Sequence, residues 1–319
     1  MTLREIALIA ALGSLCACQA RPDVAKAVSA LSSTECTPVC EDNFTVTSGG
    51  EERDLVLQVP QGYDGKIALP LILILHGFGG DSGSHCSTGN GFYCPAEAQG
   101  YAVAYLNGTL CDPSFGDEGC PADHPGRGWN SGLTPSLGIT VDDVQFVRDV
   151  IAQVGATVRI DPRRVYVVGF SNGAIMAHRL AAELSDVLAA VALSAGTIGR
   201  SLGDGLPFAT IPDAVGSIPI LMMHGTEDTA MSIDGNSGYL CPCKSLDDAL
   251  AYWLEQNPCR GPSSSVTDGT VTTTTFAGCF ANNDGVLKTI DGWPHKWPEI
   301  GTDAALSFFA KHSLTADAH

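Results

Sequence analysis

A serine lies at the junction between two segments of different pattern, in the sequence GFSNG at residues 169–173. The residues before it, 164–169, are apolar as in a buried strand, and those after it, 172–184, have the pattern of a helix. The spacing G-x-S-x-G in this context is typical of a strained turn that lifts a serine hydroxyl, here that of Ser171, above a sheet. Such a hydroxyl can attack an acyl carbon. The alternative interpretation is a plain strand-to-helix turn without chemistry.

A serine nucleophile needs a base to take its proton and an acid to orient that base. In turns of this kind both partners follow the serine in the chain. Asp228 comes just after the apolar residues 218–225, where an open parallel sheet gathers functional groups, and Glu227 is the alternative acid. His295 follows the last apolar segment and is the predicted base. The other histidines precede glycines at strand ends, lie in a helix or in cysteine-rich loops, or are terminal.

Acyl transfer also needs N–H donors for the oxyanion that forms at the attacked carbonyl. One predicted donor is the backbone N–H of Asn172, directly after the nucleophile. The other should come from the turn HGFGG at residues 76–80, and Phe78 is the predicted residue. The glycines of that turn would let a substrate carbonyl approach closely.

The surrounding chain alternates apolar runs with amphipathic segments, which predicts an α/β fold with a mostly parallel central sheet and helices on both faces. Residues 43–60 alternate around a Gly-Gly turn, as a hairpin does, and the threonine-rich residues 267–276 predict another strand or hairpin. The sequence predicts a single catalytic domain over residues 44–319. Further predicted strands are 69–75, 101–106, 164–169, 188–194, 218–225 and 285–290, and predicted helices are 140–155, 172–184, 245–257 and 301–312.

The charge balance is strongly acidic, with 35 Asp and Glu against 17 Lys and Arg and a formal net charge of -18. Binding to a phosphate backbone needs clustered basic residues, and the sequence has no basic run. We therefore expect no nucleic-acid partner.

The N-terminus predicts export. The apolar run within residues 1–18 is too short to span a bilayer but suits a signal peptide. The sequence LCAC at residues 15–18 resembles a bacterial lipobox, so Cys18 is the predicted lipid acceptor, and cleavage after Ala20 is the alternative. The polar residues 19–43 are predicted to form a tether. The expected location is extracellular or in the cell envelope, with any membrane attachment through Cys18.

Twelve cysteines also favour an oxidising compartment, since cytosolic enzymes seldom carry so many. Ten remain after Cys16 and Cys18 are set aside. We favour disulfides over a metal site for the CPC sequence at 241–243, because no second pair follows at zinc-site spacing. Close spacing suggests the pairs Cys86 with Cys94, Cys111 with Cys120, and Cys259 with Cys279.

Several segments appear in a familiar order: LPLILILHGFGGD, the run from Ile160 to Gly196, PILMMHGTED and PHKWP. Over residues 44–310 they resemble the α/β-hydrolases grouped as feruloyl esterases and polyhydroxybutyrate depolymerase-like esterases. The resemblance implies an α/β-hydrolase fold with Ser171 as nucleophile, Asp228 as acid and His295 as base. It also implies that Trp129, in GWNSG, walls the acyl pocket, with a buried core tryptophan as the alternative.

The resemblance implies a secreted serine carboxylic ester hydrolase that uses no metal and no organic cofactor. The first expected substrate is an aromatic acid ester of a plant polysaccharide, as for feruloyl esterases, and a polyhydroxybutyrate polyester is the alternative. The sequence departs from the family pattern at Trp293 and Pro294, which replace glycines before the histidine and affect substrate choice. Two hypotheses from other functional classes are a serine peptidase and a non-catalytic surface binding protein.

Overall fold

The computed structural model describes residues 36–314 apart from 88–90, 116–119, 121, 123–124, 134–136, 202–207, 236–237, 239–241 and 280–283. The predicted signal peptide, its Cys18 acceptor and most of the predicted tether lie outside the described residues.

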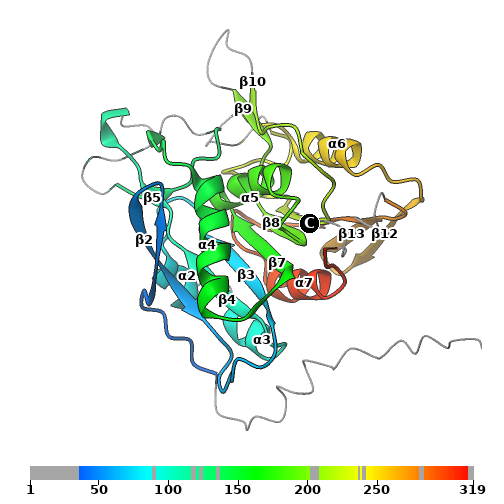
Figure 1. Ribbon diagram of the computed structural model, residues 1–319. Helices are drawn as coiled ribbons and strands as arrows, with labels where there is room; N and C mark the ends of the chain where they lie inside the picture. The colour runs from blue at the N-terminus through cyan, green and yellow to red at the C-terminus, as the bar shows by residue number, and fades with distance from the viewer. Residues whose placement is uncertain are drawn as a thin grey trace, which may run out of the picture.

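One sheet of ten strands organises the molecule, in the order β1-β2-β4-β3-β7-β8-β11-β14-β13-β12 (Figure 1). The pairs from β4 across to β14 are parallel, while β1, β2, β12 and β13 pair antiparallel at the two edges. The predicted mostly parallel α/β sheet is therefore confirmed. The strands are β1 Phe44–Ser48, β2 Glu51–Gln58, β3 Leu69–Leu75, β4 Ala102–Leu106, β7 Ile160–Phe170, β8 Ala190–Ser194, β11 Ile220–Gly225, β12 Ser263–Asp268, β13 Val271–Phe276 and β14 Gly285–Ile290.

Helices cover both faces of this sheet, as predicted, and each face has its own apolar core. On one face, strand residues such as Leu73 and Val167 pack with Phe146 of α4, Ile175 of α5 and Trp253 of α6. On the other face α3 and α7 supply the covering side chains. No helix in the described part of the chain is long and apolar enough to span a bilayer. The helices are α2 Ser82–Ser87, α3 Tyr93–Glu97, α4 Asp143–Thr157, α5 Asn172–Glu183, α6 Leu246–Gln256 and α7 Gly301–Phe309.

Shorter elements decorate the carboxyl ends of the parallel strands. Two small hairpins form there, and a single 3-10 turn precedes the second strand of the first hairpin. Because the functional residues follow parallel strands, these additions surround the same end of the sheet. They are β5 Thr109–Leu110, η1 Pro113–Phe115, β6 Arg127–Gly128, β9 Gly199–Ser201 and β10 Phe208–Thr210.

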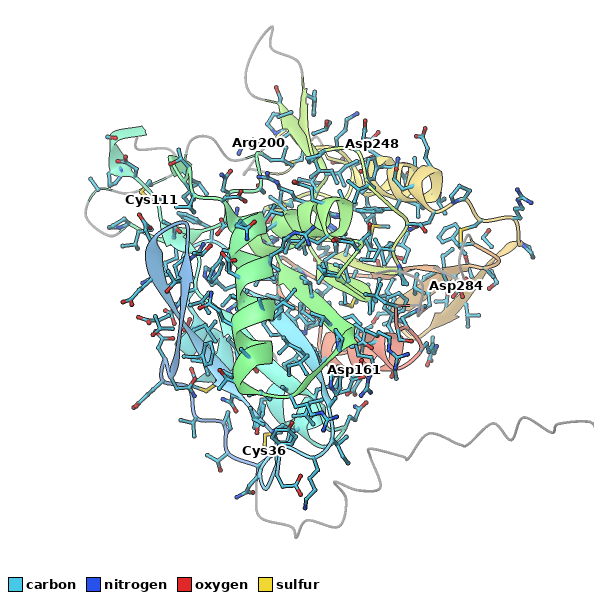
Figure 2. All side chains as sticks on the ribbon, viewed as in Figure 1. Cys36, Cys111, Asp161, Arg200, Asp248 and Asp284 are labelled. Carbon is cyan, nitrogen blue, oxygen red and sulfur yellow. A yellow bond between two sulfur atoms is a disulfide. The ribbon has the colours of Figure 1, made fainter. Side chains whose placement is uncertain are left out.

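The disulfides correct one predicted pairing. Cys36 bonds to Cys94 and Cys40 bonds to Cys86, so the predicted bond between Cys86 and Cys94 is wrong. Helices α2 and α3 present these two sulfurs to the incoming segment 36–42 instead of to each other. That segment is thus fastened to the body (Figure 2), and the prediction of a tether does not hold for its residues. The structure does contain the suggested bonds Cys111–Cys120 and Cys259–Cys279.

Candidate active site

The turn between β7 and α5 places Ser171 in a strained conformation. Its φ is 54° and its ψ is -121°, a region that side chains other than glycine rarely adopt. A Cβ on Gly169 would lie 2.3 Å from the carbonyl oxygen of Gly173, and one on Gly173 would lie 2.3 Å from that of Leu75. Both glycines of the motif are therefore needed for the helix to approach the strands. The backbone N–H of Ser171 donates to Ser194 of β8 and fixes the turn on the sheet.

The structure brings Ser171, His295 and Asp228 together in one chain of hydrogen bonds. His295 Nε2 lies 2.8 Å from Ser171 Oγ, and His295 Nδ1 lies 2.7 Å from Asp228 Oδ2. The three residues follow β7, β11 and β14, whose carboxyl ends lie at the same end of the sheet. Asp228, and not the exposed Glu227, meets the histidine. The serine is 7% exposed and the His295 side chain 21%, so solvent reaches the group from the histidine side.

Two neighbouring backbone amides hold the Asp228 carboxylate from behind. The N–H groups of Ala230 and Met231 both donate to Oδ1, at 2.9 and 2.8 Å. Burial alone would raise the pKa of Asp228, but these bonds and the bond with His295 outweigh it and lower that pKa below its ordinary value. The carboxylate is therefore ionised at neutral pH and can stabilise a cationic imidazole.

A second histidine, His224, supports this acid, a role that no sequence motif predicts. His224 Nε2 donates to the Met231 carbonyl at 2.8 Å and lies 3.6 Å from Asp228 Oδ2. It thereby holds the same turn whose amides bind the carboxylate. The sequence alone shows only that His224 precedes a glycine at the end of a strand.

The loops that carry the acid and the base are also bonded to each other. Glu227 N–H donates to the Trp293 carbonyl at 3.1 Å, and Gly292 N–H donates to Thr226 Oγ1 at 2.8 Å. A Cβ on Gly225 would lie 2.0 Å from that Trp293 carbonyl, so the two backbones touch. Trp293, expected to narrow the pocket, thus also couples the acid loop to the histidine loop.

The two predicted oxyanion donors flank the nucleophile. Asn172 is the first residue of α5, so its N–H has no partner within the helix. On the other side, a Cβ on Gly77 would lie 3.3 Å from Ser171 Cβ, which puts the turn that contains Phe78 directly beside the serine. Within the described residues, neither N–H has a hydrogen-bond acceptor. Both are available to an oxygen bound next to Ser171.

Trp129 does not wall a pocket, and that prediction is wrong. Its side chain is fully buried; Nε1 donates to the His76 carbonyl at 2.8 Å, and its backbone N–H donates to Asn172 Oδ1 at 2.8 Å. The indole therefore holds the predicted oxyanion turn by its hydrogen bond to the first residue of that turn. His76 extends this support by accepting from the Gly108 N–H at 2.9 Å, and burial lowers the pKa of His76 to about 4, which keeps it neutral.

Two aromatic residues belong to the turns that meet at Ser171: Phe170 precedes the serine in the motif, and Phe78 follows Gly77, whose turn approaches the serine. The Phe170 ring is 5.1 Å from the His295 ring between centroids and also contacts the position of Gly77. The Phe78 ring is 41% exposed and lies over Gly126 and Gly128, where any Cβ would be 3.1 Å from it. Phe170 was not among the predicted site residues, although its position directly before Ser171 in the motif places it next to the nucleophile.

The chemistry open to this arrangement is attack on an acyl carbon by an activated hydroxyl. The hydrogen-bond chain gives Ser171 a base, the acid orients that base, and the predicted oxyanion donors lie in the two turns that meet at the serine. Within the described ranges, no group of three or more His, Cys, Asp or Glu side chains is arranged to hold a metal ion.

Comparison with known proteins agrees with the fold. Over 255 residues the chain is 28% identical to feruloyl esterase B of Piromyces equi, covering 76% of this chain and 42% of that protein. Over 207 residues it is 28% identical to feruloyl esterase C of Emericella nidulans, covering 62% of this chain and 64% of that protein. The chain thus spans less than two thirds of either relative.

Solved structures and family models extend the comparison. The crystal structure of native sOPH superimposes with a TM-score of 0.59 at 19% identity, over 89% of this chain and 91% of that one, which is a likeness of fold. A model of the alpha/beta hydrolase family matches residues 72–304. With that match over most of its length, the chain belongs to the alpha/beta hydrolase family.

Proposed function

We propose that this protein is a secreted serine carboxylic ester hydrolase that acts on aromatic acid esters of plant polysaccharides. The observation that carries the proposal is the hydrogen-bond chain from Ser171 through His295 to Asp228. The relatives named as feruloyl esterases support the same reaction class.

The proposed reaction has two halves. The Ser171 oxygen attacks the ester carbonyl while His295 Nε2 takes the hydroxyl proton, and the N–H groups of Phe78 and Asn172 bind the oxyanion. His295 then gives its proton to the departing alcohol as the carbon–oxygen bond breaks, which leaves the acyl group on the serine. Water, deprotonated by His295, attacks this acyl-enzyme; His295 then returns the proton to the Ser171 oxygen as the acyl–serine bond breaks, which releases the acid and the free enzyme. Asp228 stays ionised throughout and stabilises the imidazolium.

The rings beside the nucleophile favour an aromatic acid. The Phe170 ring packs against the His295 ring, and the exposed Phe78 lies in the turn next to Ser171; aromatic rings prefer offset or edge contacts with other rings. A feruloyl group bound at the serine would bring its own ring against one of them. A short acetyl group would leave the exposed face of Phe78 in water.

Export is part of the proposal. Four disulfides are formed within the described residues, and Cys243 is also disulfide-bonded. Disulfides persist in oxidising compartments and are rare in the cytosol. Lipid attachment at Cys18 belongs to the same proposal, and mass spectrometry of the mature N-terminus tests it.

The decisive experiment is an ester panel run on the wild type and on Ser171→Ala. The panel holds methyl ferulate, an acetyl ester, polyhydroxybutyrate and a chromogenic peptide. We expect the wild type to prefer methyl ferulate and Ser171→Ala to lose about 10⁴-fold or more in kcat with an unchanged melting temperature. Ser87→Ala, at an exposed serine, is the matched control and should keep full activity.

Each alternative has its own outcome. Release of hydroxybutyrate instead of ferulate would support a polyhydroxybutyrate depolymerase. Cleavage of the peptide would support a peptidase. Absence of turnover, together with no labelling of Ser171 by a fluorophosphonate, would identify a binding protein. Full ester activity in Ser171→Ala would contradict the proposed mechanism.

A further inference from the structure

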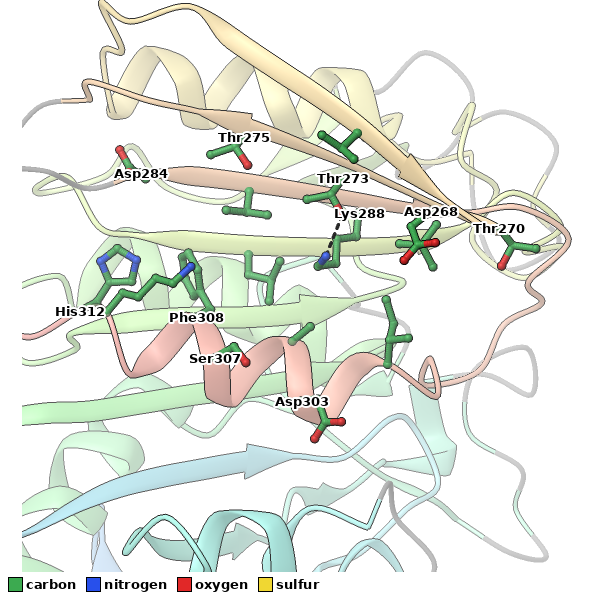
Figure 3. A pocket seen from close by; sticks show the side chains of 18 residues that line it. Asp268, Thr270, Thr273, Thr275, Asp284, Lys288, Asp303, Ser307, Phe308 and His312 are labelled. Atoms are coloured by element: carbon green, nitrogen blue, oxygen red, sulfur yellow. Dashed lines mark hydrogen bonds between the residues drawn. The ribbon is translucent and has the colours of Figure 1, made fainter. Parts of the chain in front are cut away.

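A groove lies apart from the catalytic residues, on the face of the sheet that carries α7 (Figure 3). Its walls are the strands β12, β13 and β14 on one side and α7 on the other, and its volume is about 890 Å³. None of Ser171, Asp228 and His295 lines it. The volume is near the upper end of the range for small-molecule sites, roughly 300–1,000 Å³, so an extended ligand fits better than a single small one.

The groove exists because hydroxyl-bearing side chains replace apolar ones at the edge of the sheet. Nearer the centre, β8 and β11 turn Ala192, Leu221 and Met223 toward the core that contains α7. On β13, Thr273 and Thr275 face the helix together with Val271, and all three are only half-buried. The threonine side chains leave an open space and line it with oxygen atoms that both donate and accept hydrogen bonds.

Charged groups of both signs complete the lining. Asp268, Asp284 and Asp303 bring three carboxylates, and Lys288 and Lys311 bring two ammonium groups, so the groove is nearly neutral although the whole chain carries -18. Anionic ligands would be repelled by the carboxylates. An uncharged ligand with many hydroxyls can donate to the carboxylates and accept from the ammonium groups along its length.

Lys288 leaves donors free toward this space. Its half-buried amine donates to Thr273 Oγ1 at 2.7 Å, as the dashed line in Figure 3 shows. An ammonium group has three N–H bonds, and Thr273 is its one acceptor within the part of the chain that the structure describes. The remaining donors can reach a hydroxyl oxygen in the groove.

One end of the groove is attached to the segment that carries the catalytic histidine. The turn at Gly269 and Thr270 lines that end, and the Thr270 carbonyl accepts from the Asp291 N–H at 2.8 Å. His295 follows four residues later in the chain, and Ile300, after it, lines the groove again. A polymer seated in the groove therefore ends next to the loop that holds the base.

From this lining we infer that the groove binds a segment of an uncharged polysaccharide chain, which holds the polymer while one of its esters reaches Ser171. The choice of polymer rests on the proposed function. The inference that the ligand is a neutral polyhydroxyl chain rests on the hydroxyls and paired charges of the lining, and the apolar residues beside them, such as Val286 and Phe308, can pack against the faces of sugar rings.

Calorimetric titration with xylohexaose, which carries no ester, tests the binding. We expect saturable binding by the wild type, at least about tenfold weaker binding by Ser307→Trp, which fills the groove from an exposed position, and a severalfold loss in Thr273→Val. Ala310→Trp, at the exposed residue that follows the same helix and lies outside the groove, and Thr272→Val, on the opposite face of β13, are matched controls that should bind like the wild type.

Kinetics provide the second arm. For Ser307→Trp we expect an unchanged kcat/KM on methyl ferulate and a roughly tenfold lower kcat/KM on feruloylated arabinoxylan. Equal binding of xylohexaose by wild type and Ser307→Trp would overturn the inference, and so would preferential binding of an anionic oligogalacturonate. If the wild type hydrolyses no ester, the proposed function fails, while the xylohexaose titration still decides the groove.

Discussion

Strands β7 and β13 belong to one sheet but have opposite surroundings. The second half of β7 is apolar, pairs in parallel on both sides and is covered by helices, whereas β13 is half-exposed, pairs antiparallel and carries mostly threonine. The first strand ends in a tight turn that holds a reactive hydroxyl. The second borders an open groove. Helices that cover both faces of a strand, as at β7, thus hold a site in a fixed geometry. A strand that is only partly covered, as β13 is, leaves surface open to a long ligand.

Glycine substitutions should expose this difference most strongly. Gly169→Ala would place a methyl 2.3 Å from the Gly173 carbonyl, so we expect a loss of about 3 kcal/mol or more in unfolding free energy, together with most activity. Gly269→Ala, in the β12–β13 turn, meets nothing within 4 Å and should cost about 1 kcal/mol for its φ of +57°. Urea unfolding measures both. Equal losses would contradict the comparison.

Lowering the pH should destabilise the fold through the histidines buried beside the central strands, His76 and His178. Burial lowers the pKa of His178 to about 3 and that of His76 to about 4, while unfolded histidine titrates near 6.5. Between pH 6.5 and 5 the unfolded chain binds protons that the folded chain does not, so the unfolding free energy falls as the pH falls, by about 1–2 kcal/mol for each of these histidines.

Urea unfolding at pH 6.5 and pH 5 measures this dependence. His178→Gln retains an acceptor for the Trp253 Nε1–H, which now donates to His178 Nδ1, and should flatten the pH dependence. The lowered pKa of Asp228 does not interfere, because that carboxyl loses its stabilising effect only as the pH falls below about 4. A slope unchanged in His178→Gln would contradict the account.

Exposed apolar side chains in the two regions should differ in their effect on turnover. Phe78→Ala removes an exposed ring from the turn next to Ser171, so we expect kcat/KM for methyl ferulate to fall about five- to tenfold, with little change for an acetyl ester. Val266→Ala, at a 67% exposed position on β12, is the control and should leave both unchanged. A uniform loss on both esters would make Phe78 a general support instead of a contact for aromatic acids.

Local patterns predicted the centre of the molecule well. The apolar run before Ser171 and the amphipathic segment after it determine the turn through short-range geometry. Asp228 and His295 could be chosen because each follows an apolar run, and parallel strands bring such ends together. The helix at 246–256 was also predicted from the sequence, and Ser245 caps it by accepting a hydrogen bond from the Asp248 N–H.

What the sequence could not predict depends on long-range packing. Nothing local shows that segment 36–42 runs beside α2 and α3, so Cys86 and Cys94 looked like partners. Trp129 is close to the site in space, but only the fold reveals that it lies beneath the turn and not above it. The threonines of β13 predicted a strand, whereas the groove also depends on where α7 packs.

The bond between Cys259 and Cys279 has a consequence for how this protein can diversify. It ties together the base of the hairpin that carries β12, whose residues are all exposed. Random substitutions on that strand therefore meet little purifying pressure from folding. Changes on this hairpin can therefore alter part of the groove lining, at Val266, Asp268, Thr273 and Thr275, while Ser171, Asp228 and His295 keep their places.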